Sequence, residues 1–303
     1  ARVGPTWEGD LILKGYGDPD LRRLDLKRLA RKLRATGLRR VTGSVVGDES
    51  HFDGVRTAPG WKPSFYKRWS PPISALVVNR ARFAGTVSDE PARAAALIFT
   101  RLLERQGIDV AGEPRVGSPD VANATRLARD LSRPLAALVD RMNTESDNFI
   151  AEMLIKTLGA QAHQTGTTAA GARVVKETLR TLGIPVARVR IRDGSGLSRS
   201  DRLTPRALSA MLLAALGDAG IGEVFVGSLP VGGMTGTLEE RLRKRPALGR
   251  IRAKTGTTSL SSALAGFVDD RYAFAVIMNR SPVNATVARA AQDRFVTVLA
   301  RAA

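Results

Sequence analysis

Two short polar motifs carry the chemistry that this sequence suggests. Lys254-Thr255-Gly256 ends a predicted strand, and Ser146-Asp147-Asn148 opens a predicted helix. A serine hydroxyl is a poor nucleophile until a base takes its proton, and a lysine whose pKa is lowered by burial or neighbouring cations can be that base. The two motifs therefore indicate acyl transfer without histidine.

The catalytic candidates are Ser146, Asn148 and Lys254. Ser146 is suited to relay a proton between a catalytic lysine and a leaving amine, while Asn148 is suited to donate to a substrate carbonyl and to hold the lysine. Lys254 supplies positive potential. Taken alone, Ser146 is better interpreted as a helix N-cap, and Lys254 has the alternative of a surface lysine at a strand end. The presence of both motifs favours function.

The residues after Lys254 are the candidates for binding substrate. The hydroxyls of Thr255 and Thr257 are suited to bind a terminal carboxylate, and Gly256 lets a substrate backbone lie against the strand edge. The Thr257 N–H is also a candidate oxyanion-hole donor. The alternative is that Thr255-Gly256-Thr257 is an ordinary turn.

Composition excludes several other kinds of site. The chain has no cysteine, so disulfides, thiolate nucleophiles and iron–sulfur clusters are excluded. Its two histidines, His51 and His163, are too few for a multi-histidine metal site. We therefore expect neither a metal nor a cofactor.

The net charge of +18 raises the question of an anionic partner. The 38 arginines and 9 lysines are scattered along the whole chain. The densest run, residues 21–40, is typical of the solvent-exposed side of an amphipathic helix. No aromatic residues interleave there to stack on bases. We therefore expect no nucleic-acid partner. We expect no transmembrane segment either, because no run of 18 apolar residues occurs.

Hydrophobic periodicity predicts an α/β (α+β) chain. Up to about residue 54 it predicts a small α/β unit, which a Pro-rich passage over 58–72 and a strand over 74–78 follow. Helices dominate from Pro91, and the last part is antiparallel strands with a closing helix. The predicted helices are 24–36, 92–106, 134–143, 147–158, 168–182, 205–216 and 285–299, and the late strands are 251–254, 263–268 and 272–278.

With these two motifs the chain resembles the D-alanyl-D-alanine carboxypeptidase/endopeptidase family, the class C low-molecular-mass penicillin-binding proteins. Beyond the two motifs, the resemblance extends over nearly the whole chain in the family's order. It rests on Gly9-Asp10-Leu11-Ile12-Leu13 with Gly17-Asp18-Pro19, Gly60-Trp61, Ser74-Ala75-Leu76-Val77-Val78-Asn79, Asp193-Gly194-Ser195-Gly196-Leu197-Ser198, and Leu229-Pro230 through Gly236-Thr237-Leu238.

The resemblance implies a serine β-lactamase/transpeptidase-like fold, in which helices cover a five-stranded antiparallel sheet. Residues 1–90 would be an accessory domain inserted between catalytic motifs, and 91–303 the penicillin-binding catalytic domain. A further inserted domain, which the family often has after the segment matching Asn79, is not expected in this chain. Leu197 is expected to line the substrate cleft, with Trp69 as a residue of the site wall.

The nucleophile is expected to lie outside this chain. The family's Ser-x-x-Lys motif precedes the Gly-Asp-Leu segment, which begins here at residue 9, so the catalytic domain is expected to lack its N-terminal part. The single match, Ser64-Phe65-Tyr66-Lys67, follows Pro63 in the Pro-rich passage, and we interpret it as accidental.

The resemblance implies a serine-type peptidase that cleaves D-Ala-D-Ala bonds of peptidoglycan stem peptides through an acyl-enzyme. Its implied partners are those stem peptides and β-lactams, and its implied location is periplasmic or extracellular, at the cell wall. The alternative is a non-catalytic wall-binding relative. A class A β-lactamase is disfavoured by the long region before Ser146, and the oligomeric state stays open.

Overall fold

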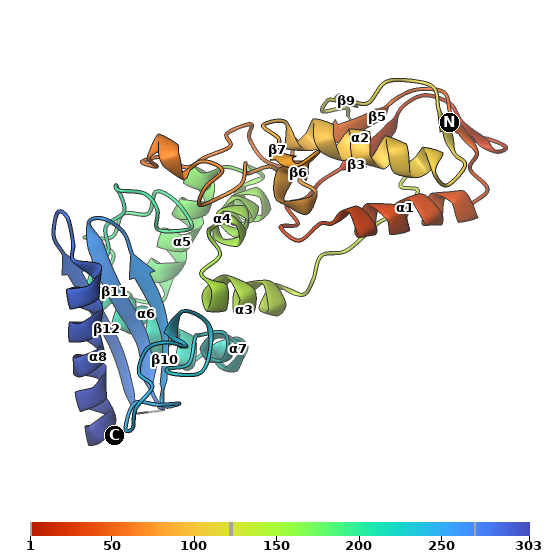
Figure 1. Ribbon diagram of the computed structural model, residues 1–303. Coiled ribbons are helices and arrows are strands. Elements are labelled where there is room, and N and C mark those ends of the chain that lie inside the picture. The colour runs from red at the N-terminus through yellow and green to blue at the C-terminus, as the bar shows by residue number, and fades with distance from the viewer. Residues whose placement is uncertain (1, 121–123, 270) are drawn as a thin grey trace. The chain divides into compact units, whose positions relative to one another are not determined.

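The computed structural model describes residues 2–120, 124–269 and 271–303, and the chain forms two compact units. The first comprises Ala1–Arg133 and Glu152–Gly171, and the second Pro134–Ala151 and Ala172–Ala303. The chain therefore changes unit three times: after Arg133, within helix α4 (Asn148–His163) and within helix α5 (Thr168–Thr181). Figure 1 labels both helices.

The first unit is an α/β unit, as the sequence predicts. One small sheet has the order β3-β5-β9 with parallel pairing, a second has the order β1-β2-β4-β8, and β6 and β7 form an antiparallel pair. Its elements are β1 (Arg2–Val3), β2 (Thr6–Trp7), β3 (Leu11–Lys14), α1 (Arg23–Ala35), β4 (Arg40–Val41), β5 (Val45–Asp48), the 3₁₀ turns Pro63–Phe65 and Asn79–Ala81, β6 (Arg82–Phe83), β7 (Thr86–Val87), α2 (Pro91–Glu104), β8 (Asp109–Val110) and β9 (Arg115–Val116).

Helices α1 and α2 share the hydrophobic core of the first unit. Leu26 and Leu33 of α1 are buried in one cluster with Ala95 and Leu103 of α2 and with residues of β3 and β5. The first compact unit therefore includes α2 and continues to Arg133, while the expected division at residue 90 stays a prediction. Periodicity predicts the helix at Pro91, but it does not reveal that the helix packs back on the residues before it.

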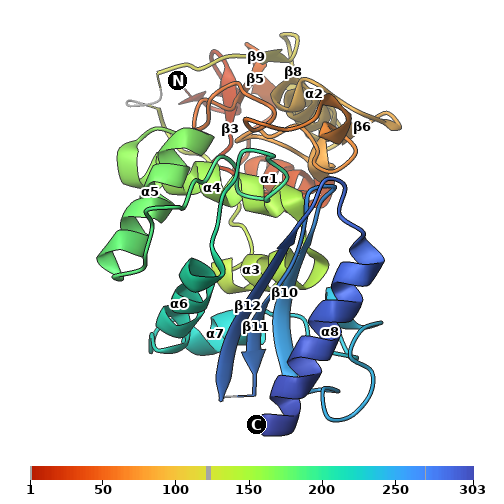
Figure 2. The ribbon, with the colours of Figure 1, turned by 90° about the vertical axis from the view of Figure 1, so that its left-hand side faces the viewer.

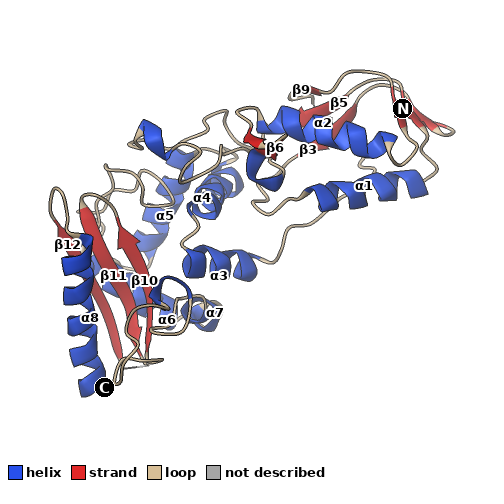
Figure 3. Ribbon diagram, viewed as in Figure 1, coloured by secondary structure: helices blue, strands red, loops and turns tan. Residues whose placement is uncertain are grey.

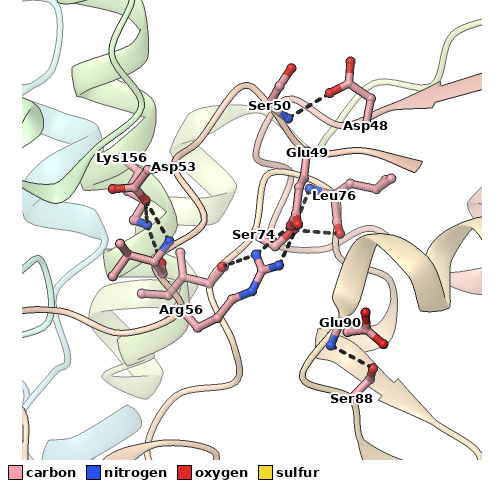
Figure 4. A network of polar contacts seen from close by, with 12 residues as sticks. Asp48, Glu49, Ser50, Asp53, Arg56, Ser74, Leu76, Ser88, Glu90 and Lys156 are labelled. Carbon is pink, nitrogen blue, oxygen red and sulfur yellow. Dashed lines mark hydrogen bonds and ion pairs between the residues drawn. The ribbon is translucent and has the colours of Figure 1, made fainter. Parts of the chain in front are cut away.

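A buried polar network connects the loop after β5 to other parts of the first unit (Figure 4). Arg56 and Glu49 form a double hydrogen bond with both N–O distances at 2.6 Å, and Ser74 donates to Glu49. The fully buried Lys156 of α4 donates to Asp53 and, at 2.6 Å, to the Val55 carbonyl. Because these partners come from distant parts of the chain, the network fixes the loop over residues 49–56.

The strand predicted over 74–78 is wrong, because this segment is buried but has no regular structure. The Ser74 hydroxyl accepts from the Leu76 N–H, and the Ala75 carbonyl accepts from Gly17. These contacts satisfy the backbone without a ladder of strand pairs. An apolar run alone does not distinguish such a segment from a buried strand.

The second unit is built on the antiparallel sheet β10-β11-β12, which Figure 3 shows in red. Its strands are β10 (Ile251–Thr257), β11 (Ser261–Val268) and β12 (Tyr272–Asn279). Its other elements are α3 (Leu135–Glu145), α6 (Pro205–Leu216), α7 (Gly222–Gly227), the 3₁₀ turn Gly236–Leu238 and α8 (Ala285–Ala302). Three strands form this sheet in the described part of the chain, not the five that the resemblance implies.

Helices cover both faces of this sheet, as expected for the fold. Leu264 and Val268 of β11 pack in one cluster with Val296 of α8, whereas Phe267 packs with Leu212 of α6. Even and odd residues of one strand point to opposite faces, so α8 and α6 lie on opposite sides of the sheet (Figure 2). Within the described residues, no helix is long and apolar enough to cross a membrane.

Candidate active site

Ser146 occupies the junction between α3 and α4. It adopts a left-handed backbone conformation, with φ of 57° and ψ of 49°, and ends α3. The residue that caps α4 is Asp147, whose Oδ1 accepts from the Ile150 N–H at 3.2 Å. Ser146 is therefore not the N-cap that its sequence context also allowed, and its hydroxyl is available for another contact.

That contact is with Lys254 of β10. The Lys254 Nζ donates to the Ser146 Oγ at 2.7 Å and to the Thr255 carbonyl at 2.9 Å. Burial lowers the pKa of Lys254 to about 8. The amine is therefore mostly charged at neutral pH, yet it loses its proton more easily than an ordinary lysine. The structure thus brings together the two motifs that the sequence singles out.

The strand that carries Lys254 lies at the edge of its sheet. Backbone hydrogen bonds from Gly232 to Ile251 and from Ala253 to Pro230 cover the first part of the outer edge of β10. The residues from Lys254 to Thr257 extend beyond this pairing. An added Cβ at Gly256 would meet Ala263 at 3.7 Å, an ordinary contact, so internal packing does not require a glycine there. The edge is thus suited to receive an extended peptide.

The two sides of β10 present different groups. By strand alternation, Lys254 lies on the face of the sheet that carries α6, whereas Thr255 and Thr257 lie on the face that carries α8. Thr257 is exposed, and its hydroxyl accepts from Arg289 of α8 at 3.4 Å. Both threonine side chains therefore flank the open edge from the α8 side.

The segment over residues 228–238, which contains no predicted site residue, supports both motifs. The Asn143 amide donates to the Ser228 hydroxyl at 2.8 Å, and Thr144 donates to the Ser228 carbonyl at 3.2 Å. Gly236 has a positive φ of 54°, and a Cβ there would collide with the Thr144 carbonyl. The residues 228–238 thus hold the end of α3, immediately before Ser146.

The same segment reaches the Lys254 strand through Thr237, whose hydroxyl accepts from Thr255 at 2.8 Å. The sequence offers one indication that Thr237 is functional, because it lies in a stretch that carries the family resemblance. A lone threonine in a 3₁₀ turn has no chemical pattern that would mark it as functional. Its contact with Thr255 makes it a further residue of the candidate site.

The other sequence candidates are Asn148, Leu197 and Trp69. Asn148 is the first residue of α4 and is half-buried. Leu197 is half-buried in a loop of the second unit, where the Asp193 carboxylate accepts from the N–H groups of Gly196 at 2.8 Å and Ser198 at 2.6 Å. Trp69 belongs to the first unit and is 51% exposed. The roles of Asn148, Leu197 and Trp69 in the site stay predictions.

The isolated Ser-x-x-Lys match has no helix to support it. Ser64 is exposed in a three-residue 3₁₀ turn, and Lys67 pairs with Asp89 at 2.6 Å. In a helix, residues i and i+3 lie on one face, but this short turn does not continue to Lys67.

Among the described residues, no group of three or more acidic, histidine or cysteine side chains is placed to hold a metal ion.

Residues 3–90 and 84–302 match the sequence profile of the D-Ala-D-Ala carboxypeptidase 3 (S13) family. A D-alanyl-D-alanine carboxypeptidase of Actinomadura sp. (strain R39) is 31% identical, over 89% of this chain and 65% of its own length. A carboxypeptidase of Mycobacterium tuberculosis is also 31% identical, over 98% of this chain and 68% of its own. The chain thus spans about two thirds of these relatives.

The fold is also found in solved structures. Penicillin-binding protein 4 of Haemophilus influenzae superposes with a TM-score of 0.81 at 23% identity, over 94% of this chain and 79% of that protein. The same protein complexed with a novel β-lactam superposes with a TM-score of 0.76 at 22% identity, over 94% and 78%. At such identities the likeness establishes the fold of the chain.

Proposed function

Because the chain belongs to the D-Ala-D-Ala carboxypeptidase 3 (S13) family, we propose that its protein is a serine-type D-alanyl-D-alanine carboxypeptidase/endopeptidase. Its substrates are the stem peptides of peptidoglycan, and β-lactams are its inhibitors. The reaction proceeds through an acyl-enzyme, in which a serine hydroxyl attacks the carbonyl of the penultimate D-alanine and the terminal D-alanine leaves with its amine protonated.

The residues of the candidate site have separate roles in this proposal. Ser146 relays a proton to the leaving amine, and Asn148 donates to the substrate carbonyl. Lys254 and the hydroxyls of Thr255 and Thr257 attract the terminal carboxylate, while Gly256 leaves room for the substrate backbone beside β10. Leu197 and Trp69 are the proposed wall residues.

The observation that carries the proposal is the 2.7 Å hydrogen bond between Lys254 and Ser146. It joins two motifs that lie far apart in the chain, and it positions a hydroxyl beside an amine whose pKa is lowered to about 8. Such a pair can pass a proton at neutral pH, whereas a purely structural lysine gains nothing from a lowered pKa. A non-catalytic wall-binding protein would need the carboxylate site but not this pair.

The location belongs to the proposal as well. Peptidoglycan lies outside the cytoplasmic membrane, so a protein with this activity must be exported to the periplasm or the cell surface. Fractionation of cells that produce the full-length protein tests this point. Recovery of the protein in the cytoplasm alone would contradict it.

The activity is tested with the full-length protein and a peptide that ends in D-Ala-D-Ala. We expect release of D-alanine and covalent labelling by a fluorescent penicillin. Ser146→Ala should lower the acylation rate by roughly 100-fold or more, because loss of a positioned proton-transfer group has an effect of that order. Arg294→Gln, an exposed change on α8, is the matched control. Binding of the peptide without release or labelling would support the non-catalytic alternative instead.

A further inference from the structure

Arg289 is a cation next to the candidate substrate edge, and it has no anionic partner among the residues that the structure describes. It is exposed on α8, and its Nη2 donates to the Thr257 hydroxyl at 3.4 Å. In the part of the chain that the structure describes, it forms no ion pair with a carboxylate. A guanidinium beside a hydroxyl, without a carboxylate of its own, is suited to receive an anion from outside.

The natural partner of Arg289 on its own helix is occupied. Asp293 lies four residues further along α8, the spacing at which an arginine and a carboxylate can pair. Its carboxylate instead accepts from Arg241, at 2.6 Å to Nη2 and 3.1 Å to Nε. Arg241 is the better partner because its side chain is only 13% exposed, so its pairing with Asp293 is less screened by solvent.

Arg241 also holds other parts of this stretch of α8. Its Nη2 donates to the Gln292 side chain at 3.1 Å and to the Arg289 carbonyl at 3.5 Å. Gln292 is fully buried and donates to Ser262 of β11 at 3.0 Å. These contacts attach the backbone of α8 at Arg289 to the sheet. The backbone at Arg289 is therefore held in place, while no carboxylate in this part of α8 neutralises its guanidinium.

We propose that Arg289 is a specificity-determining residue that binds the free terminal carboxylate of the substrate together with the Thr257 hydroxyl. The inference rests on the proposed function, because it places a substrate carboxylate at the Thr255 and Thr257 side of β10. A planar guanidinium can donate two parallel hydrogen bonds to a carboxylate, which a lysine ammonium cannot do. Arg289 thus selects ligands that end in a carboxylate over those that end in an amide.

The test is equilibrium binding of acetyl-D-Ala-D-Ala and of its C-terminal amide to the full-length protein, measured by NMR titration. Binding itself requires no turnover, and spectra recorded on fresh mixtures before D-alanine accumulates keep the result independent of the reaction. We expect the wild type to prefer the free acid. Arg289→Gln should weaken binding of the acid by about three- to tenfold and leave binding of the amide unchanged, as expected for one exposed charge-assisted hydrogen bond.

Two further variants distinguish the guanidinium from charge alone and from a structural effect. Arg289→Lys should recover only part of the preference, because it keeps the charge without the planar fork. Arg294→Gln, an exposed arginine on the same helix, should bind both ligands like the wild type. The preference should also shrink as salt is raised from 0.05 to about 0.5 M, because salt screens exposed charges.

Three outcomes overturn the inference: no preference of the wild type for the acid, an equal loss for both ligands in Arg289→Gln, or no loss for either. The proposed function fails differently. If the wild type prefers the acid through Arg289 but neither releases D-alanine nor reacts with penicillin, the binding role stands and the enzyme activity does not.

Discussion

The lowered pKa of Lys254 leads to a quantitative prediction about pH. Burial moves this pKa from 10.5 to about 8, a difference of about 2.5. With a pKa near 8, roughly nine in ten Lys254 side chains are charged at pH 7 and roughly one in ten at pH 9. If the ammonium attracts the terminal carboxylate, affinity for acetyl-D-Ala-D-Ala should therefore fall up to about tenfold between these pH values.

The same shift predicts a change in stability. The folded pKa lies below the unfolded value, so between pH 8 and pH 10.5 the unfolded chain binds more protons at this site than the folded chain. The free energy of unfolding should therefore rise with pH through this window. Each unit of pKa corresponds to about 1.4 kcal/mol, so this pKa difference gives at most about 3.5 kcal/mol, and about 2 kcal/mol is expected because the side chain is only partly buried.

The assay is an NMR titration of the lysine Cε resonances, with Lys254→Met as the assignment control. One resonance should titrate near pH 8 in the wild type and be missing in the variant. Affinity for the peptide should fall through the same pH value in the wild type and stay flat in Lys254→Met. The reasoning is refuted if Lys254 titrates above pH 10 with the surface lysines, or if the affinity is flat while Lys254 loses its proton.

Three substitutions test other contacts. Thr237→Val removes the hydroxyl that accepts from Thr255 and should weaken binding of the free-acid peptide about three- to tenfold in the same titration. Thr237→Ser should keep the wild-type affinity, and an equal loss of affinity in both variants would show that the hydroxyl does not contribute to binding. Asp147→Ala removes the cap of α4 and should lower the free energy of unfolding in urea by about 1 kcal/mol; no change would show that the cap contributes nothing. Asp53→Asn leaves the buried Lys156 amine without its anion and should lower the free energy of unfolding by about 3 kcal/mol. Adding Lys156→Met should restore part of this stability, and no recovery would show that the loss has another cause.

The sequence selected the two motifs of the candidate site but predicted neither the hydrogen bond between Lys254 and Ser146 nor the contacts around it. Lys254 and Ser146 belong to motifs whose chemistry makes sense only together, so their proximity was expected. Thr237 and Arg289 act through single hydroxyl and guanidinium contacts between distant segments, and no local pattern announces such contacts. The same limit applies to Ser146 itself, because only the structure shows that Asp147 takes the capping role.

The fold was predictable where local periodicity decides it. Helices and late strands appear close to their expected bounds, because each has an apolar face with a clear period. The division of the chain at residue 90 stays a prediction, but periodicity did not reveal that α2 packs with α1, β3 and β5 in one hydrophobic core. The strand over 74–78 was wrong because Ser74 offers the backbone a local alternative to strand pairing.

The division of the chain between its two units determines how the protein can be synthesised and cut. Ribosomes complete the first unit only when Gly171 has been made, and by then Pro134–Ala151 of the second unit already exists. Cleavage after Arg133 separates Asp53 from its partner Lys156, so the N-terminal fragment carries a loop without its anchor. A gene for the first unit alone has to join the codon of Arg133 to that of Glu152, and in doing so it removes Ser146.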